Sequence, residues 1–586
     1  MARGRGARQL AALAVALLLM LGLGVTVGAS FYRPATDHPE ATARAYLRYR
    51  EILTYVDRDY VDSVDAEGLT DYALAQMLGR LDPHSVYIPA RERAQADAFL
   101  LSSFDGVGLE YNVFRDTATV LAALPGGPAE AAGLRPGDQL LRLDDAPLAG
   151  AGLSARQFSQ RLRGARGSHL RLLVARPGLA APLPFDLVRA ALPDPSVEPA
   201  LLLPAPDEAS EAGTASSLAN SSLSHPAASS GPDGNPGSGS VAPVVAAPAS
   251  VAPAAADARP ARTGYLRVSR FAAGTYDEFK VQLAEIRRLG ATRLVLDLRD
   301  NPGGYLDRAT RVADEFIAGA RQLVHTVGRD EQYASQTYAH AAGDWEQEPL
   351  VVLVDENSAS AAEVLAGALQ DHDRALLVGR RTFGKGLVQQ PIRLQDGGEL
   401  RLTVARYYTP SGRCIQKPYG PDRASYDREL SERDARGERP QADSTRPGER
   451  FRTDHGRVVY GGGGIVPDVL VPHDSLRRTA YHAHLDQAGA LQACALRIFR
   501  RHRAELTALR PAQYAAEFQV SDAELDDLAR LGTLAGLPPA DPAALRRAAP
   551  ALRASLRVGV ARLAYGPAVA RALRLADDPE LRQAMR

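Results

Sequence analysis

Short apolar runs alternate with helix-like segments through the middle of the chain. The runs are rich in Val and Leu and comprise residues 294–298, 350–354 and 375–378. Runs of this length and composition are typical of buried strands. The neighbouring segments 279–289, 306–317 and 360–366 are rich in good helix formers and predict helices. The pattern therefore predicts an α/β core.

Helical patterns flank this core on both sides. In residues 41–101, the side chains of Leu47, Ile52, Val56 and Tyr60 fall close to one face by i, i+4 spacing, which predicts an amphipathic helix. After about residue 474 the chain is rich in Ala, Leu and Arg and is also predicted to be helical. We expect this C-terminal extension to serve in packing or self-association.

Residues 204–262 have a different composition, dominated by Ala, Pro, Ser and Gly. Such a segment cannot bury enough apolar surface to offset the entropy lost on ordering, so it is predicted to be disordered. It separates a strand near Ser196–Val197 from a strand at 264–268. We interpret it as an insertion between two strands of one domain.

The first 29 residues have the features of a targeting segment. Arg3, Arg5 and Arg8 precede an almost wholly apolar stretch, Leu10–Gly28. This stretch is long for a cleaved signal and near the minimum length for a membrane span. The preceding arginines argue against a buried core helix. We predict export to the bacterial periplasm, and both cleavage and retention as an inner-membrane anchor are left open.

Charge and cysteine content exclude several classes of protein. The chain has 69 basic and 69 acidic residues, which argues against a broad nucleic-acid-binding surface. Two cysteines, Cys414 and Cys494, do not make a disulfide framework. His482 and His484 are too isolated for a metal site, and no Gly-Lys-Ser/Thr follows the glycines at 461–464. We therefore expect no metal and no cofactor.

The candidate chemistry lies between residues 350 and 390. A strand, a polar turn and a helix place Ser360 at a helix N-terminus, where free backbone N–H groups lie. Ser360 and Glu363 also fit a capping box, which would make the serine structural. Lys385 follows 25 residues later between two glycines, and Gln389 lies on the next strand. The serine and the lysine together favour catalysis over capping.

This block resembles the catalytic core of the C-terminal processing peptidases, also called tail-specific proteases. The resemblance covers residues 46–472 and implies a ClpP/crotonase-like α/β core without a cofactor. It also implies that Ser360 is the nucleophile, Lys385 the general base and Gln389 the residue that orients the lysine. Asp371 matches an acidic position of the family, and we expect it to be supportive.

A lysine base has a physical requirement. A free lysine is protonated at neutral pH, so Lys385 must be buried enough to disfavour its charged form. Small and apolar neighbours such as Phe383, Gly384 and Gly386 are compatible with dry packing around the amine. We also expect no carboxylate to pair tightly with it, because such a partner would retain the proton.

A glycine-rich turn at Asn301–Gly304 follows the predicted strand 294–298 and precedes a predicted helix. Glycines in such a turn allow backbone amides to point at a developing oxyanion. The resemblance implies that Gly303 or Gly304 supplies one oxyanion-hole N–H and that Ala361 supplies the other. The sequence does not decide between the two glycines.

Residues 103–190 resemble a PDZ domain, which implies a partly open β-barrel with helices. Gly106, Val107, Gly108 and Leu109 resemble its carboxylate-binding loop, and residues 129–138 carry a strong PDZ signature. A glycine loop can offer N–H groups to a terminal carboxylate while the tail adds as a strand to the sheet edge. Residues 157–162 are expected to form the groove helix, and 170–174 a closing strand.

These predictions describe a multidomain α/β protein. Its predicted parts are a signal or anchor (1–29), a helical segment (41–102), the PDZ domain (103–190), the disordered insertion (204–262), the protease core (191–203 and 263–472) and the helical extension (473–586). The expected activity is that of an exported serine endopeptidase acting on proteins with apolar C-terminal tails. An adaptor protein, a homo-oligomer and membrane contact through the N-terminal segment are left open as partners.

Two other functions compete with this hypothesis. One is a PDZ scaffold whose protease core is inactive. The other is a conventional Ser-His-Asp hydrolase that uses His372 or His325.

Overall fold

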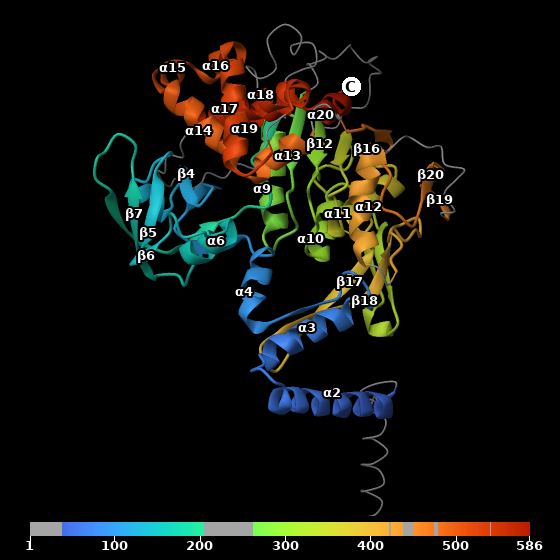
Figure 1. Ribbon diagram of the computed structural model, residues 1–586. Coiled ribbons are helices and arrows are strands. Elements are labelled where there is room, and N and C mark those ends of the chain that lie inside the picture. The colour runs from blue at the N-terminus through green and yellow to red at the C-terminus, as the bar shows by residue number, and fades with distance from the viewer. Residues whose placement is uncertain are drawn as a thin grey trace, which may run out of the picture. The chain divides into compact units, whose positions relative to one another are not determined.

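The computed structural model describes most of the chain (Figure 1). The described residues are 38–203, 262–340, 342–420, 423–436, 449–473, 479–538 and 541–586. They form two compact units, Met1–Leu78 and Gly79–Arg586. The targeting segment predicted at 1–29 and nearly all of the predicted disordered insertion lie outside the described residues.

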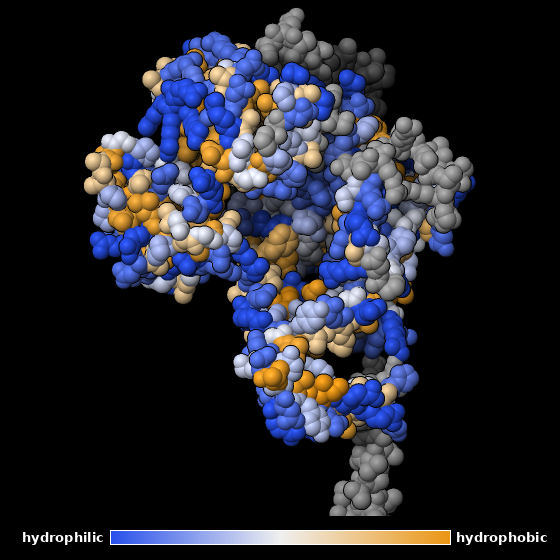
Figure 2. Space-filling model, in the orientation of Figure 1, coloured by the Kyte–Doolittle hydropathy of each residue, from blue (hydrophilic) through white to orange (hydrophobic). Residues whose placement is uncertain are grey.

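The first unit contains two helices, α2 (Pro39–Asp59) and α3 (Ala66–Leu78). The helix predicted from the spacing of Leu47, Ile52 and Val56 is present as α2. No residue of α2 is buried, however, and the exposed fractions of Leu47 and Ile52 are 51% and 56%. Hydrophobic residues accordingly lie among polar ones on the surface of this unit (Figure 2). Nowhere in the described chain is a helix both long and apolar enough to cross a bilayer.

A six-stranded sheet forms the centre of the second unit, in the order β10-β11-β12-β15-β16-β21. Its strands are β10 (Leu201–Leu203), β11 (Thr263–Arg267), β12 (Arg293–Asp297), β15 (Leu350–Val354), β16 (Leu376–Gly379) and β21 (Val469–Leu470). From β11 to β21 neighbouring strands are parallel, whereas β10 pairs antiparallel with β11. The predicted apolar runs are β12, β15 and β16, and their continuous hydrophobicity is explained by burial on both faces of the sheet.

Three helices cover one face of this sheet. They are α9 (Thr275–Arg288), α10 (Leu306–Asp314) and α11 (Ala361–Asp371), and they match the predicted helices to within a few residues at each end. Their apolar faces share one core with the sheet, which includes Phe279, Val312 and Leu365. Every residue of α11 is buried, so this helix is held rigidly.

The other face of the sheet is covered by the end of the C-terminal extension. Helices α19 (Pro567–Ala576) and α20 (Pro579–Ala584) contribute Leu575 and Leu581 to a cluster that contains Leu353 and Val378 of the sheet. Burying each such side chain is worth about 1.5–3 kcal/mol. The packing role expected for this extension is therefore observed, and its partner is the protease sheet itself.

A second sheet carries the lysine-bearing region. Its strands are β1 (Val86–Ile88), β13 (Gln322–Gly328), β14 (Ser335–Tyr338), β17 (Leu387–Arg393) and β18 (Glu399–Tyr408), in the order β1-β18-β13-β14 with β17 paired to β18. A hairpin turn at Gly397–Gly398 joins β17 to β18. A bulge between Val388 and Gln389 shifts the register of this pair.

The PDZ region folds as a small sheet with two helices. The sheet has the order β3-β4-β5-β7-β8, so β3 (Leu109–Phe114) is an edge strand. The other elements are β2 (Ser103–Gly106), β4 (Thr117–Ala123), α5 (Pro128–Ala131), β5 (Gln139–Leu143), β6 (Ala146–Pro147), α6 (Ala155–Leu162), β7 (His169–Ala175), β8 (Leu183–Val188) and β9 (Ala190–Pro193). The predicted groove helix and closing strand correspond to α6 and β7.

The rest of the C-terminal extension is a helical bundle with its own core. Its helices are α13 (Ala480–Gln487), α14 (Ala490–Arg501), α15 (Arg503–Ala508), α16 (Pro511–Glu517), α17 (Asp522–Leu534) and α18 (Pro542–Tyr565). The bundle contacts the PDZ region. The Asn112 side chain donates to the Gly489 carbonyl (3.0 Å), and Arg500 donates to the Gly137 carbonyl (2.7 Å).

The sequence of residues 414–455 is charged and irregular, which predicts an excursion over the surface of the domain, but this region is in part a structured and buried element. It contains α12 (Arg423–Arg436) and β19 (Arg450–Arg452), and β19 pairs with β20 (Val458–Tyr460). Ile415 and Tyr426 are buried, and Lys417 is buried against the rings of Phe383 and Tyr426. The expectation was wrong because the charged residues that suggested a surface segment are paired, as in the 3.1 Å bond from Lys417 to Glu429.

Candidate active site

Three loops that leave the carboxyl ends of parallel strands come together at one edge of the central sheet. The first follows β12 and contains Asn301, the second follows β15 and ends at Ser360, and the third follows β16 and ends at Lys385. The Ala359 amide donates to the Asn301 carbonyl (2.9 Å), and the Phe383 amide donates to the Ser358 carbonyl (3.0 Å). Ligands of open α/β sheets bind at this kind of edge, so it is the natural position for a site.

Ser360 has an unusual backbone conformation, with φ 55° and ψ −116°. A non-glycine residue with such angles is strained by about 1–3 kcal/mol and is held there by its surroundings. The Glu363 amide donates to the carbonyl of Ser360 (2.9 Å), not to its hydroxyl. Ser360 and Glu363 have the arrangement of a capping box, but the Ser360 hydroxyl makes no cap hydrogen bond within the described chain, so capping accounts for the glutamate and not for the hydroxyl.

Glu363 connects the serine and the lysine. It is fully buried, and its Oε2 accepts from the amides of both Ser360 and Lys385, each at 2.8 Å. Because both bonds end on one oxygen, the two nitrogens lie at most twice that distance, or 5.6 Å, apart. Its Oε1 accepts from the Thr382 hydroxyl (2.5 Å) and the Gly384 amide (2.7 Å). Burial raises the pKa of Glu363 to about 7, against the lowering effect of these four hydrogen bonds.

Tyr407 of β18 makes a second link between the same residues. Its ring is buried, and its hydroxyl contacts the Ser360 carbonyl (3.1 Å) and the Lys385 carbonyl. The backbones of Ser360 and Lys385 are thus joined through a carboxylate on one side and a phenol on the other.

Lys385 is half-buried, and its amine donates to Gln389 Oε1 at 3.0 Å. Burial lowers the pKa of Lys385, although nearby Glu363 and Asp82 oppose the shift. Within the described residues the amine forms no ion pair. The same residues show no hydrogen bond between the Lys385 amine and the Ser360 hydroxyl. The amine has three donors and uses one on Gln389.

Gln389 is oriented by His84, which is not among the residues predicted for the site. Its Nε2 donates to the carbonyl oxygen of His84, which leaves Oε1 for Lys385. The His84 ring in turn contacts the Tyr426 hydroxyl through Nε2 at 2.8 Å. Burial, followed by the charge of Lys385, lowers the pKa of His84 to about 4, so the ring is neutral at pH 7.

The turn that presents His84 is organised by Asp82, which sequence reasoning missed. This buried carboxylate accepts from the amides of His84 and Ser85, both at 2.8 Å, and from the Ser85 hydroxyl at 2.6 Å. It also accepts from the Thr403 hydroxyl (3.1 Å), and Thr403 pairs with Gln389 across β17 and β18. The sequence Asp-Pro-His-Ser indicates a turn. The residues that bond to this turn, Gln389 and Thr403, lie 305 and 321 residues away from their partners in the chain, so the sequence does not reveal the contact.

Two backbone amides beside Ser360 have no acceptor among the described residues, those of Ala361 and Gly304. The Gly303 amide, by contrast, donates to Asn301 Oδ1 at 2.9 Å. Gly303 has φ 97°, and a Cβ there would lie 2.8 Å from the Ser360 Cβ. Gly304 has φ 141°, and a Cβ there would overlap the Phe271 carbonyl. The structure therefore favours Gly304 over Gly303 as the free donor.

The remaining predicted residues lie away from Ser360. Asp371 ends α11, about 16 Å along the helix from the serine, and pairs with buried Arg413 at 2.7 Å. His372 follows it and bonds to Asp454 (2.8 Å). His325 stacks on Tyr408 in the second sheet. Neither histidine forms a hydrogen bond with Ser360, which weakens the Ser-His-Asp alternative.

The predicted tail-binding loop lies between β2 and β3. Gly106 ends β2, Leu109 begins β3, and Gly108 has φ 75°. In the described chain the amides of Val107 and Gly108 have no acceptor. A ring contact between Tyr111 and Phe158, with centroids 6.3 Å apart, connects the edge strand β3 to α6. A free strand edge, a neighbouring helix and free amides suit a docked peptide end.

Comparison with known proteins agrees with this geometry. Residues 262–424 match peptidase family S41, residues 119–176 match a PDZ domain, and residues 481–566 match a family of unknown function. The carboxyl-terminal-processing protease of Synechocystis sp. is 33% identical over 350 residues, which cover 59% of this chain and 68% of that protein. The carboxy-terminal-processing protease of Bartonella bacilliformis is 29% identical over 385 residues, which cover 65% of this chain and 75% of that protein.

Among solved structures, the photosystem II D1 C-terminal processing protease is 26% identical, with 74% of this chain and 94% of that chain covered and a TM-score of 0.34. The sequence matches define the class as a PDZ-containing S41 peptidase. The chain belongs to the carboxyl-terminal-processing proteases, which are serine peptidases of that family.

Proposed function

We propose that this protein cleaves peptide bonds with a Ser360–Lys385 dyad. The observation that carries the proposal is the double link through Glu363 and Tyr407, which fixes a strained serine beside a lysine whose pKa is lowered by burial. A lysine needs such burial to be a base near neutral pH. Gln389 holds the amine by a hydrogen bond that does not add a negative charge.

The chemistry follows from these positions. The neutral Lys385 amine takes the Ser360 proton as the hydroxyl oxygen attacks the substrate carbonyl. The amides of Ala361 and Gly304 stabilise the oxyanion, and each such donor is worth about 3–4 kcal/mol of barrier lowering. The lysine then protonates the leaving amine, and later it takes a proton from the water that hydrolyses the acyl-enzyme.

We propose that the PDZ region selects substrates by their C-terminal tails. The free amides of Val107 and Gly108 support recognition of a terminal carboxylate, and the position of β3 at the edge of its sheet supports pairing with an extended tail. The apolar lining supplied by β3 and α6 favours tails that end in apolar residues. In this proposal the apolar N-terminal segment directs the protein to the periplasm, as a soluble or an anchored enzyme.

One assay tests the activity and both alternatives. An unfolded substrate with an apolar tail is incubated with wild type, Ser360→Ala, Lys385→Ala and His372→Ala, and cleavage is followed by mass spectrometry. The proposal predicts cleavage by wild type and His372→Ala only. Cleavage by Ser360→Ala would refute the dyad. Loss of cleavage in His372→Ala alone would also refute it and would favour the Ser-His-Asp hydrolase. Absence of cleavage by wild type would favour the PDZ scaffold with an inactive core.

A second substrate tests tail recognition. The same unfolded protein is given a tail that ends in two aspartates, and kcat and KM are compared. Docking in the PDZ groove predicts a higher KM for the charged tail. An unchanged kcat/KM would contradict this part of the proposal.

A further inference from the structure

Two arginines begin loops of the candidate active site. Arg299 is the second residue after β12 and lies five residues before Gly304, and Arg380 directly follows β16, five residues before Lys385. Both guanidinium groups are largely buried, with side-chain exposures of 14% and 8%. Each needs acidic partners, because a buried charge without one is strongly unfavourable.

Each arginine has local partners of its own. Arg299 pairs with Asp297 at 2.6 Å, and Arg380 pairs with Glu356 at 2.6 Å and with Asp355 at 3.8 Å. These bonds hold each arginine to its own strand or to the neighbouring turn. Asp355 also accepts from the Asp300 amide (3.0 Å), but none of these carboxylates connects Arg299 to Arg380.

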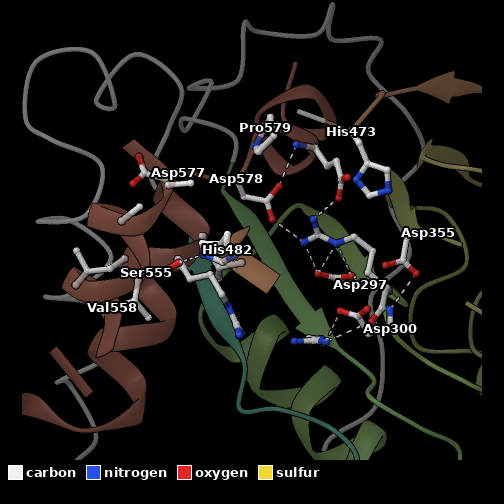
Figure 3. Close-up of a pocket in the computed structure, with 18 of the residues that line it drawn as sticks. Asp297, Asp300, Asp355, His473, His482, Ser555, Val558, Asp577, Asp578 and Pro579 are labelled. Carbon is white, nitrogen blue, oxygen red and sulfur yellow. Dashed lines mark hydrogen bonds and ion pairs between the residues drawn. The ribbon is translucent and has the colours of Figure 1, made fainter. Parts of the chain in front are cut away.

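Glu580 of α20 makes that connection. Its Oε2 bonds to Arg299 Nη1 and its Oε1 bonds to Arg380 Nη1. Among the ion pairs of the described residues, this carboxylate alone contacts both arginines. Asp578, at the start of α20, adds a 2.7 Å bond to Arg299, and Figure 3 shows Asp578 and Asp297 turned toward the same guanidinium.

Glu580 is held firmly enough to act as a fixed point. Asp578 caps α20 by accepting from the amides of Glu580 (2.9 Å) and Leu581 (3.0 Å). Leu581 packs with Leu353 and Val378 of the sheet, and Glu580 itself is 7% exposed. These contacts fix the position of the Glu580 carboxylate relative to the ends of β12 and β16.

We propose that Glu580 is a positioning residue for the peptidase reaction. It acts through Arg299 on the loop that presents the Gly304 amide, and through Arg380 on the loop that presents Lys385. The inference rests on the proposed function, since it assigns a role in the same site. The oxyanion donor and the base must both be correctly placed for the same transition state. A displacement of either group by about 1 Å can lower the rate about 10²-fold.

The test compares Glu580→Gln with Asp526→Asn, which removes one exposed carboxylate from α17 of the same extension. Wild type and Ser360→Ala serve as references. Steady-state cleavage gives kcat and KM, and an active-site-directed fluorophosphonate gives the rate of Ser360 labelling. The fluorescence of Trp345, the single tryptophan of the chain and a buried core residue, reports folding of the protease core.

For Glu580→Gln we expect at least a tenfold fall in kcat and in labelling rate, with KM within threefold of wild type and native Trp345 fluorescence. Asp526→Asn should match wild type. A kcat within twofold of wild type would overturn the inference, and so would an activity loss that only follows the unfolded fraction.

A shorter carboxylate keeps the test decisive if Glu580→Gln does not fold. Glu580→Asp keeps the charge but cannot reach both arginines, so we expect native fluorescence with kcat lowered at least threefold. A wild-type kcat in this variant would overturn the inference. If Ser360→Ala cleaves like wild type, the proposed function fails instead, whatever the Glu580 variants do.

Discussion

Glu363→Gln is the substitution whose effect the structure defines most fully. The buried Glu363 carboxylate accepts four hydrogen bonds, two of them from the Ser360 and Lys385 amides. A glutamine offers one acceptor oxygen, and its amino group would face two donors. If the oxygen stays with Thr382 and Gly384, the amides of Ser360 and Lys385 lose their acceptor.

Two opposing effects set the change in stability. Each buried amide left without an acceptor costs about 1–3 kcal/mol, so the pair costs about 2–6 kcal/mol. The substitution also removes a carboxylate whose pKa burial raises to about 7. Above pH 7 the folded wild type bears the cost of the buried charge, and glutamine relieves it.

The sign of the pH dependence follows from proton binding. An acid whose pKa is higher in the folded state binds its proton more tightly when folded, so its contribution to stability falls as pH rises toward 7. A pH of 5.5 lies about 1.5 units below the pKa of Glu363 in the folded state. At about 1.36 kcal/mol per unit, the free energy of unfolding of wild type is therefore about 2 kcal/mol higher at pH 5.5 than at pH 8.5. Glu363→Gln lacks this gain.

Urea denaturation followed by Trp345 fluorescence measures the effect in the protease core. Glu363→Gln and its wild-type reference both carry Ser360→Ala, which prevents self-cleavage. We expect Glu363→Gln to be more destabilising at pH 5.5 than at pH 8.5 by about 2 kcal/mol. Glu517→Gln, an exposed substitution in α16, should show no such difference. A destabilisation by Glu363→Gln that is equal at the two pH values would show that Glu363 does not titrate with a raised pKa in the folded protein.

Three further substitutions test other parts of the site. Lys385→Arg should lower kcat about 10²–10⁴-fold, because arginine stays protonated and cannot serve as base; peptide cleavage with more than a tenth of wild-type kcat would contradict this. Gly304→Ala should lower kcat about 10²-fold or more, since its Cβ overlaps a backbone carbonyl, whereas Gly319→Ala, also at a positive φ (76°) but with open space around the added Cβ, should retain wild-type kcat. Asp371→Asn leaves Arg413 as a buried unpaired charge and should cost about 3–5 kcal/mol in urea denaturation, and an unchanged midpoint would exclude a structural role.

The strands and helices of the core could be predicted because their patterns are local. Residues 350–354 are continuously apolar since both faces of β15 are buried, and Ser360 begins α11 where the capping pattern placed it. The serine, the lysine and Gln389 followed from a family pattern of fixed spacing. The same local pattern did not reveal the full role of Glu363. Its spacing from Ser360 predicts a helix cap, whereas in the structure its carboxylate joins the Ser360 and Lys385 loops.

What escaped prediction depends on contacts between distant parts of the chain. His84 reaches Gln389 from 305 residues away, and Glu580 reaches Arg380 from 200 residues away. Neither periodicity nor composition contains such pairings, because a charged or polar residue looks the same whether it is solvated or buried with a partner. Region 414–455 was misjudged for the same reason.

The central claim is that Ser360 is activated by a Lys385 amine that is neutral in the folded protein. The most direct measurement is the rate of Ser360 labelling by a fluorophosphonate as a function of pH, in wild type and in Lys385→Ala. In wild type we expect a labelling rate that rises with pH through one ionisation whose pKa lies below the ordinary lysine value. In Lys385→Ala the rate should be lower by about 10²-fold or more, without that ionisation. Equal labelling of the two proteins, or a wild-type rate that does not change with pH, would contradict this activation of Ser360 by Lys385.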